Sequence, residues 1–93
     1  MFRVITDVSA MVRNLKTFEL IDKKSLVLRV QFPEGFAYKI TVRFKTCMKN
    51  AKLCCQMLES LREKGHTVKL ISTTASRSRT VTIEYEFFEK NEQ

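Results

Sequence analysis

Three cysteines and one histidine are the residues of this sequence best suited to bind a metal ion or to do redox chemistry. Cys47, Cys54 and Cys55 are close together in the chain, and His66 follows them. They form no C-x-x-C pair, and adjacent side chains on a helix point about 100° apart, so Cys54 and Cys55 do not converge on one tetrahedral ion. Because cysteine is often buried as a small hydrophobic residue, we expect core packing, no metal and no cofactor. A thiol switch is the less favoured alternative.

Two pairs of glutamates and His66 are the remaining groups that could do acid–base chemistry. Glu59 and Glu63 are spaced i, i+4 among basic neighbours, which predicts a solvated helix face with local charge pairing. Glu84 and Glu86 alternate along a predicted strand, and we expect them to pair across strands with basic residues. The candidate partners are Lys39, Arg43 and Lys69. His66 has no acid or nucleophile beside it in the sequence. With no P-loop, G-x-G-x-x-G or G-x-S-x-G motif either, the prediction is that the protein is not an enzyme.

The uneven distribution of basic residues gives the clearest functional signal. There are 17 Lys and Arg against 10 Asp and Glu, a net charge of +7. Residues 35–58 hold five bases and no acid, and residues 64–83 hold four bases and no acid. On the predicted strands these bases alternate with apolar residues and share their phase with threonines. We therefore expect a basic, hydroxyl-rich sheet face suited to phosphate and sugar contacts. The candidate nucleic-acid-binding or anion-binding residues are Arg29, Lys39, Arg43, Lys45, Lys49, Lys52, Lys69, Arg77 and Arg79.

Two local features add to this signal. Lys45, Lys49 and Lys52 crowd the start of a predicted helix, where the helix dipole disfavours each cation by up to about 1 kcal/mol. A bound anion would relieve that conflict, whereas solvent and salt would make it negligible. The loop at residues 76–80 carries two arginines that can follow a phosphate backbone. The same loop can instead be a flexible solvated turn or a phosphorylation site.

The elements that would position these residues follow from the spacing of apolar side chains. Residues 2–6 are rich in β-branched types and predict a short strand, with a helix as the alternative. A helix capped by Thr6 or Asp7 is expected next, with Val8 and Val12 on its apolar face. Residues 18–21 fit either an extension of this helix or the start of a strand.

The rest of the chain alternates between strand and helix periodicity. Residues 26–32 and 36–45 are expected to form a hairpin, with apolar side chains alternating inward. A longer helix is predicted over residues 47–64, ending at a glycine in the C′ position. Strands are predicted at residues 68–73 and 81–87.

This order of elements predicts an α+β domain with a single antiparallel-rich sheet and two helices on one face. Without its last strand, the predicted order is β-α-β-β-α-β, which is that of the ferredoxin-like sandwich. The last predicted strand would be an extra C-terminal strand of that sheet. Residues 1–93 are expected to form a single compact domain, and residues 90–93 a frayed polar tail.

Composition and cysteine usage indicate where the protein acts. No uncharged stretch approaches the roughly 20 residues that span a bilayer, and the N-terminus lacks the apolar region of a signal peptide. An odd number of cysteines, two of them adjacent, suits a reducing compartment. The expectation is an intracellular protein of the cytoplasm or nucleus, with no membrane partner.

The favoured functional prediction is a small non-enzymatic nucleic-acid-binding module, with RNA slightly favoured over DNA. Most aromatic residues fall in the inward phase of the strands, so binding should be led by backbone contacts and depend strongly on salt. The alternative is a protein–protein interaction or assembly subunit, such as a homodimer formed through a sheet edge. Apolar residues at outward positions, Ile21, Ile71 and Phe88, favour this alternative. The basic face would then steer an acidic protein surface toward the chain.

Overall fold

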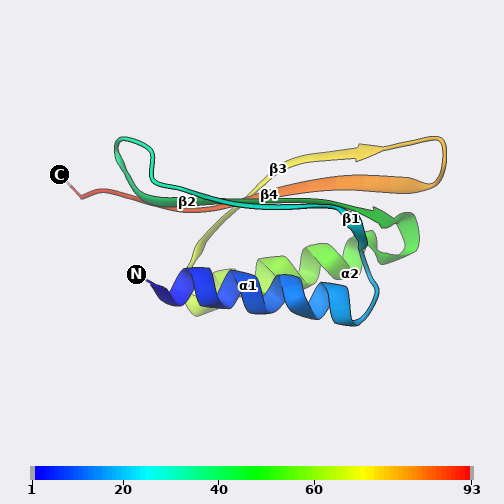
Figure 1. The fold of residues 1–93 in the computed structure, drawn as a ribbon, viewed down its shortest axis with the longest axis horizontal. Helices are drawn as coiled ribbons and strands as arrows, with labels where there is room; N and C mark the ends of the chain where they lie inside the picture. The colour runs from blue at the N-terminus through cyan, green and yellow to red at the C-terminus, as the bar shows by residue number, and fades with distance from the viewer. Residues whose placement is uncertain (1, 93) are drawn as a thin grey trace.

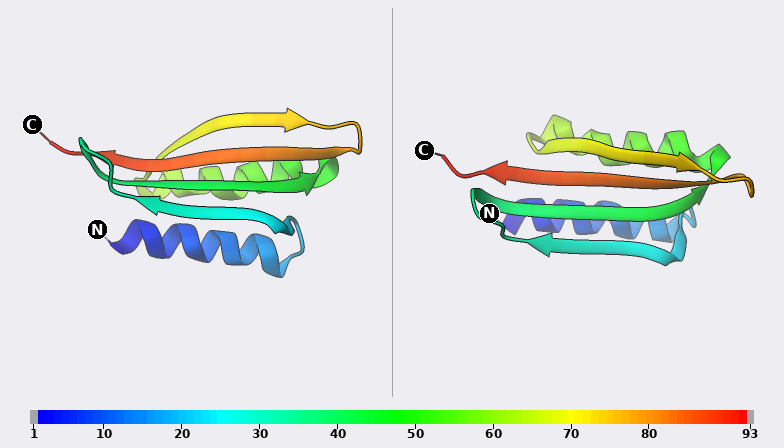
Figure 2. Two further views of the ribbon diagram at one scale, coloured as in Figure 1. Left: turned by 45° about the horizontal axis from the view of Figure 1, so that its top comes forward. Right: turned by 90° about the horizontal axis from the view of Figure 1, so that it is seen from above.

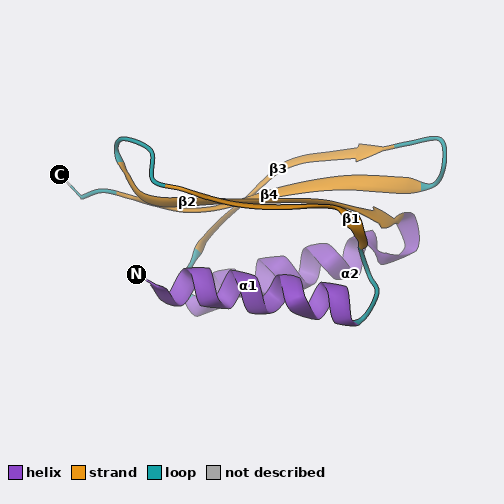
Figure 3. Cartoon of the chain, viewed as in Figure 1, coloured by secondary structure: helices purple, strands orange, loops and turns teal. Residues whose placement is uncertain are grey.

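Two helices pack against one face of a four-stranded antiparallel sheet in the computed structural model, which describes residues 2–92 (Figure 1). In chain order the elements are α1 (Phe2–Thr17), β1 (Asp22–Gln31), β2 (Phe36–Cys47), α2 (Met48–Glu59), the 3₁₀ helix η1 (Ser60–Lys64), β3 (Thr67–Ala75) and β4 (Thr80–Lys90). Figure 3 shows that both helices lie in one layer on the same side of the sheet. The predicted α+β class, with one antiparallel sheet and two helices, is confirmed.

The N-terminal segment is a helix, so the short strand predicted at residues 2–6 is wrong, as is a helix start at Thr6 or Asp7. β-Branched Val4 has a weak local preference for strand, but it falls on the same helix face as Val8, and both side chains are buried. Burial of this face outweighs the local preference. The described chain runs helix, two strands, helix, two strands. The ferredoxin-like order with an extra strand is not confirmed.

Strand order is β1-β2-β4-β3, so the second strand of each hairpin lies in the centre of the sheet (Figure 2). Each half of the chain is a helix followed by a hairpin, and the halves join where β2 pairs with β4. This pairing runs from Phe36 opposite Lys90 to Cys47 opposite Thr80. The long central pair therefore connects the two ends of the molecule.

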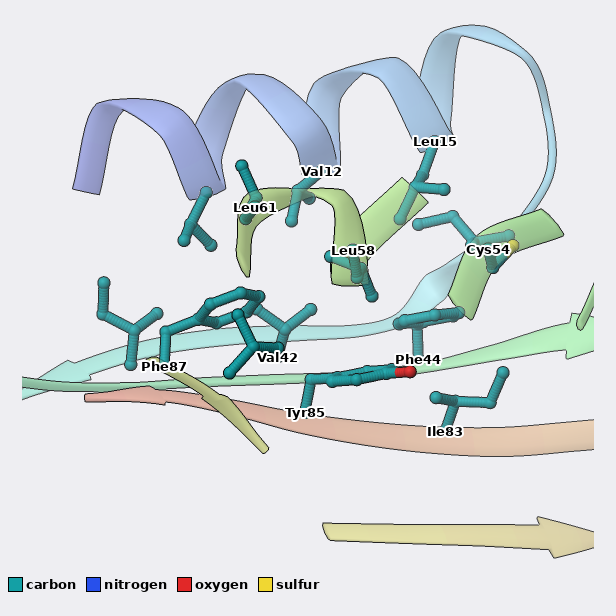
Figure 4. Close-up of a cluster of buried hydrophobic side chains, with 14 of the residues drawn as sticks. Val12, Leu15, Val42, Phe44, Cys54, Leu58, Leu61, Ile83, Tyr85 and Phe87 are labelled. Carbon is teal, nitrogen blue, oxygen red and sulfur yellow. The ribbon is translucent and has the colours of Figure 1, made fainter. Parts of the chain in front are cut away.

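The core lies between the central strands and the helices (Figure 4). Its buried members from the strands include Ile40, Val42, Phe44, Ile83, Tyr85 and Phe87. Those from the helical layer include Val8, Val12, Leu15, Cys54, Leu58 and Leu61. Alternation on the strands and spacing of three or four on the helices place these residues inward, as the sequence predicted.

The helices cover the central strands and leave the edge strands partly open. Leu28 and Val30 of β1 pair with Val42 and Ile40 and therefore face the helical side, yet both are exposed. Ile21 behaves in the opposite way: the sequence placed it outward, but it is buried. These exposures depend on whether a helix covers the edge of the sheet. The alternation of apolar and polar residues along a strand does not show which strand will lie at an edge.

The chain remains paired close to its C-terminus. Lys90 is the last residue of β4, and the Asn91 N–H donates to the Gly35 carbonyl at 3.0 Å. Lys90 therefore belongs to the sheet, and Asn91 is hydrogen-bonded to the turn between β1 and β2, although residues 90–93 were expected to form a frayed tail. Gln93 lies outside the described residues.

Candidate nucleic-acid interface

The sheet face opposite the helices carries five of the nine predicted basic residues. The strand registers and the alternation of side chains place on it Arg29, Lys39, Arg43, Lys45 and Lys69. The hydroxyl side chains expected beside them, Thr41, Thr67, Thr80 and Thr82, lie on the same face. The grouping predicted for the sheet is therefore present.

Two glutamates in the middle of this face reduce its positive charge. Glu86 forms an ion pair with Lys39 at 3.6 Å, which confirms the expected cross-strand partner. The registers also place Glu86 opposite Lys69 and Glu84 opposite Arg43. Lys39, Arg43 and Lys69 thus have carboxylates close by, and the sheet face is only weakly positive.

A shallow depression of about 100 Å³ lies on this face, lined by Val27, Arg29, Thr41, Arg43 and Glu84. Guanidinium groups can donate paired hydrogen bonds to phosphate oxygens. A carboxylate can accept a hydrogen bond from a sugar hydroxyl. The lining therefore combines two guanidinium donors with one carboxylate acceptor.

The other four predicted basic residues lie at one end of the molecule. Lys49 and Lys52 are exposed in the first turns of α2, and Arg77 and Arg79 are exposed in the turn between β3 and β4. The Met48 N–H donates to the Arg79 carbonyl at 3.0 Å, so this turn contacts the start of α2. Figure 1 shows the turn and the start of α2 at the same end.

Three further lysines reach this end, and the sequence analysis missed them. Lys16 lies in the last turn of α1, and Lys23 and Lys24 lie at the start of β1. The Thr46 hydroxyl donates to the Leu20 carbonyl at 2.5 Å. The Lys45 N–H donates to Ser25 Oγ at 2.9 Å. These bonds hold the connection between α1 and β1 beside the end of β2.

We call this surface the basic end. Its basic residues are Lys16, Lys23, Lys24, Lys45, Lys49, Lys52, Arg77 and Arg79, and its acidic residues are Glu19 and Asp22. Which turns share an end of a domain depends on strand order, and spacing along the chain does not give that order.

The opposite end has no such excess of positive charge. It contains the start of α1, the turn between β1 and β2, the end of α2 with η1, and the last residues of β4 (Figure 1). Its acidic residues are Asp7, Glu34, Glu59, Glu63, Glu89 and Glu92, and its basic residues are Arg3, Arg62, Lys64 and Lys90. Charge is therefore polarised along the 46 Å long axis of the molecule.

The start of α2 adds to the positive potential of the basic end. Cys47 occupies the N-cap with extended backbone (φ −73°, ψ 153°), makes no side-chain capping bond, and is followed by no acid in the first turn of Met48–Glu59. Lys49 and Lys52 lie exposed in the first turns of this helix. The positive end of the helix dipole and the lysine charges therefore coincide.

Hydroxyl groups stabilise the turn that carries the two arginines. Ser76 Oγ lies 2.8 Å from Ser78 Oγ and 2.6 Å from Thr80 Oγ1. The Arg79 N–H donates to the Ser76 carbonyl at 3.3 Å, with Arg79 at a positive φ of 61°. The turn is thus closed by its own hydrogen bonds, and both arginine side chains are exposed.

The cysteines lie in and around the core. Cys54 is fully buried, and its thiol lies within weak hydrogen-bonding distance of the Leu20 carbonyl (3.9 Å) and the Thr46 hydroxyl (3.8 Å). Burial raises the pKa of the Cys54 thiol. Cys47 and Cys55 are half-buried. In the part of the chain that the structure describes, His, Cys, Asp and Glu side chains form no group of three or more that could hold a metal ion.

His66 pairs with an acid that the sequence analysis did not identify. Its Nε2 lies 2.7 Å from Asp7 Oδ2, and both side chains are largely buried. The hydrogen bond from His66 holds the pKa of Asp7 below its ordinary value, despite the opposing effect of burial. The sequence predicted a strand before Thr6 and Asp7, and it therefore gave no reason to expect a contact between α1 and the residue that precedes β3.

Comparison of the chain with protein-family models and with curated proteins gave no match. No helix in residues 2–92 combines the length and the apolar character needed to cross a membrane. The distribution of charge over the folded chain therefore carries the functional argument.

Proposed function

We propose that this protein is a small non-enzymatic nucleic-acid-binding module, with RNA slightly favoured over DNA, and that its basic end leads the binding. The observation that carries the proposal is the convergence of eight basic and two acidic residues on one end of the molecule. Separate parts of the chain supply these bases: the end of α1, the start of β1, the end of β2 with the start of α2, and the turn after β3. Such a concentration of cations is suited to a phosphate backbone.

The sheet face has a supporting role in this proposal. Arg29, Thr41 and Arg43 line the shallow depression and can contact a strand that continues from the basic end along the sheet. Glu84 and Glu86 weaken the attraction of phosphate to this face. We therefore assign most of the electrostatic binding energy to the basic end and additional backbone contacts to the sheet.

The proposal is tested by reversing equal charge at the two ends. Lys49→Glu/Arg77→Glu at the basic end and Lys64→Glu/Lys90→Glu at the opposite end both lower the net charge from +7 to +3. Fluorescence anisotropy with labelled RNA and DNA, at salt from about 50 to 300 mM, measures affinity and its salt dependence. The basic-end variant should lose at least about tenfold in affinity and show a shallower salt slope. The matched variant should remain close to the wild type, and equal losses in both variants would contradict a role for the basic end.

A second candidate function is assembly with another copy of the chain through β1. Within the described chain β1 has no strand on its outer side (Figure 2). Its exposed Leu28 and Val30 face the helical layer. The regularly paired part of β1, Val27 to Gln31, lies on the side away from the basic end. Antiparallel pairing of two copies along this segment would keep their basic ends apart, which limits charge repulsion.

Sedimentation velocity across a concentration series tests this assembly. Leu28→Lys places a charge on the β1 edge and should abolish a dimer. Leu70→Lys makes the same change at a similarly exposed leucine on the other edge strand, β3, and should leave the dimer intact. A wild-type protein that stays monomeric at every concentration would exclude this candidate.

A further inference from the structure

Phe18 is the most exposed large hydrophobic side chain described in the structure, and it lies at the basic end. Its relative exposure is 66%, and it follows α1 directly, two residues after Lys16. Exposing an aromatic ring of this size leaves apolar surface in water that folding does not require. Phe18 thus presents an exposed aromatic ring at the end of the molecule that holds the excess of lysines and arginines.

The backbone around Phe18 is fixed by a regular helix ending. The Phe18 N–H donates to the Asn14 carbonyl at 3.0 Å, and the Leu20 N–H donates to the Leu15 carbonyl at 3.0 Å. The Glu19 N–H donates to the Lys16 carbonyl at 3.1 Å, with Glu19 in the left-handed region at φ 54°. These bonds form a Schellman motif.

This motif directs Phe18 away from the core. In a Schellman ending the residue after the left-handed position, here Leu20, supplies the apolar contact with the last turn of the helix. Leu20 is half-buried and packs against the core that contains Leu15. Phe18 precedes the left-handed residue and has no part in that contact. Its ring is therefore held in solvent by a hydrogen-bonded backbone.

We infer that Phe18 is a base-stacking residue and that the basic end takes a single-stranded nucleic acid. Unpaired bases present open ring faces that stack on aromatic side chains, whereas the bases of a duplex are already stacked. Lysines beside such a ring hold the backbone, and the ring contacts the base whatever its identity. This inference rests on the proposed function and adds to it the class of nucleic acid.

The chain supplies a matched control for this inference. Phe32 has almost the same exposure, 64%, but it follows β1 at the opposite end of the molecule. Phe18→Ala and Phe32→Ala thus remove the same ring from surfaces of different charge. Circular dichroism on both variants confirms that the fold is retained.

The test measures binding of fluorescent oligouridine and of a duplex RNA over a salt series. Phe18→Ala should weaken oligouridine binding by about 5- to 100-fold, as expected for loss of one stacked base. The slope of log affinity against log salt should stay unchanged, because no phosphate contact is removed. Phe18→Trp should retain or increase affinity, and Phe32→Ala should bind like the wild type.

The outcomes separate this inference from the proposed function. Equal oligouridine binding by the wild type and Phe18→Ala would overturn the stacking inference. The proposed function would still stand if Lys49→Glu/Arg77→Glu lost affinity in the same assay. A wild type that binds the duplex as tightly as oligouridine would also overturn the preference for single strands, and absence of binding by the wild type would overturn both.

Discussion

The Asp7 carboxylate and the His66 imidazole are 59 positions apart in the chain and 2.7 Å apart in the fold. Asp7 lies in α1, and His66 lies between η1 and β3. The pair therefore ties the first helix to the segment where the chain returns to the sheet. This contact is largely buried, so solvent screens it less than the exposed charges of the basic end.

The titration of Asp7 gives a prediction about stability and pH. Because the pKa of Asp7 is lowered in the folded state, its contribution to stability is present above the unfolded value and is lost as pH falls through the folded value. The free energy of unfolding of the wild type should exceed that of Asp7→Asn at about pH 5, and the difference should shrink toward about pH 3. Urea unfolding at several pH values measures this difference.

Glu63→Gln is the control for this experiment, since Glu63 is an exposed carboxylate on η1. That variant should unfold like the wild type throughout the pH series. A difference between the wild type and Asp7→Asn that stayed constant down to about pH 3 would show that the pair does not lower the pKa of Asp7.

Side-chain pairing could be predicted where it follows from strand alternation, and not elsewhere. The Lys39–Glu86 ion pair was anticipated because both residues face outward on neighbouring strands. Asp7 lies in a helix and His66 in the connection before a strand. Their contact depends on how α1 packs in the helical layer beside η1. No spacing rule relates two such positions.

At the scale of elements, the two helical segments end in different ways. η1 ends at Gly65, which adopts φ 92° at no steric cost, and the sequence predicted this end correctly. α1 ends at Thr17, and Glu19, two residues later, adopts a left-handed conformation that favours glycine. No glycine marks the end of α1 in the sequence, where residues 18–21 fit either an extension of the helix or the start of a strand. The sequence therefore located one helix end and not the other.

Replacing Glu19 with glycine should stabilise the protein. A non-glycine residue in the left-handed region costs about 1 kcal/mol, so Glu19→Gly should raise the free energy of unfolding by about 0.5–1 kcal/mol. Glu19→Gln removes the same charge but keeps the side-chain penalty, and it should give no comparable gain. Thermal and urea unfolding of the three proteins compare these effects. A gain of equal size in Glu19→Gln would assign the effect to charge and not to backbone conformation.

The strand predicted at residues 2–6 shows how neighbouring elements decide a local preference. Val4 and Ile5 favour strand by type, yet α1 includes them because Val4 extends the buried face formed by Val8, Val12 and Leu15. A window of five residues contains no information about that face. The hairpin of β1 and β2, in contrast, was predicted because alternation and the turn at residues 33–35 both lie within the local sequence.

For the whole molecule, charge polarity depends on topology. The acid-free stretches at residues 35–58 and 64–83 were visible in the sequence, and five of their bases lie at the basic end. Lys16, Lys23 and Lys24 join them only because α1 ends, and β1 begins, beside the end of β2. The sequence predicted which basic residues share the sheet face. That Glu84 and Glu86 reduce the positive charge of this face could be seen only once the pairing of β2, β4 and β3 was known.

This difference between the two surfaces gives a prediction at the same scale. Lys39→Glu/Arg43→Glu on the sheet face and Lys49→Glu/Arg77→Glu at the basic end change the net charge equally, from +7 to +3. Lys39 is already paired with Glu86, and Arg43 lies opposite Glu84, so neither contributes a full charge to a bound backbone. The sheet-face variant should therefore lose several-fold less affinity for oligouridine than the basic-end variant, and its salt slope should change less. If the sheet-face variant instead showed the larger loss, the sheet would be the main binding surface, and the polarity of the molecule would serve another purpose.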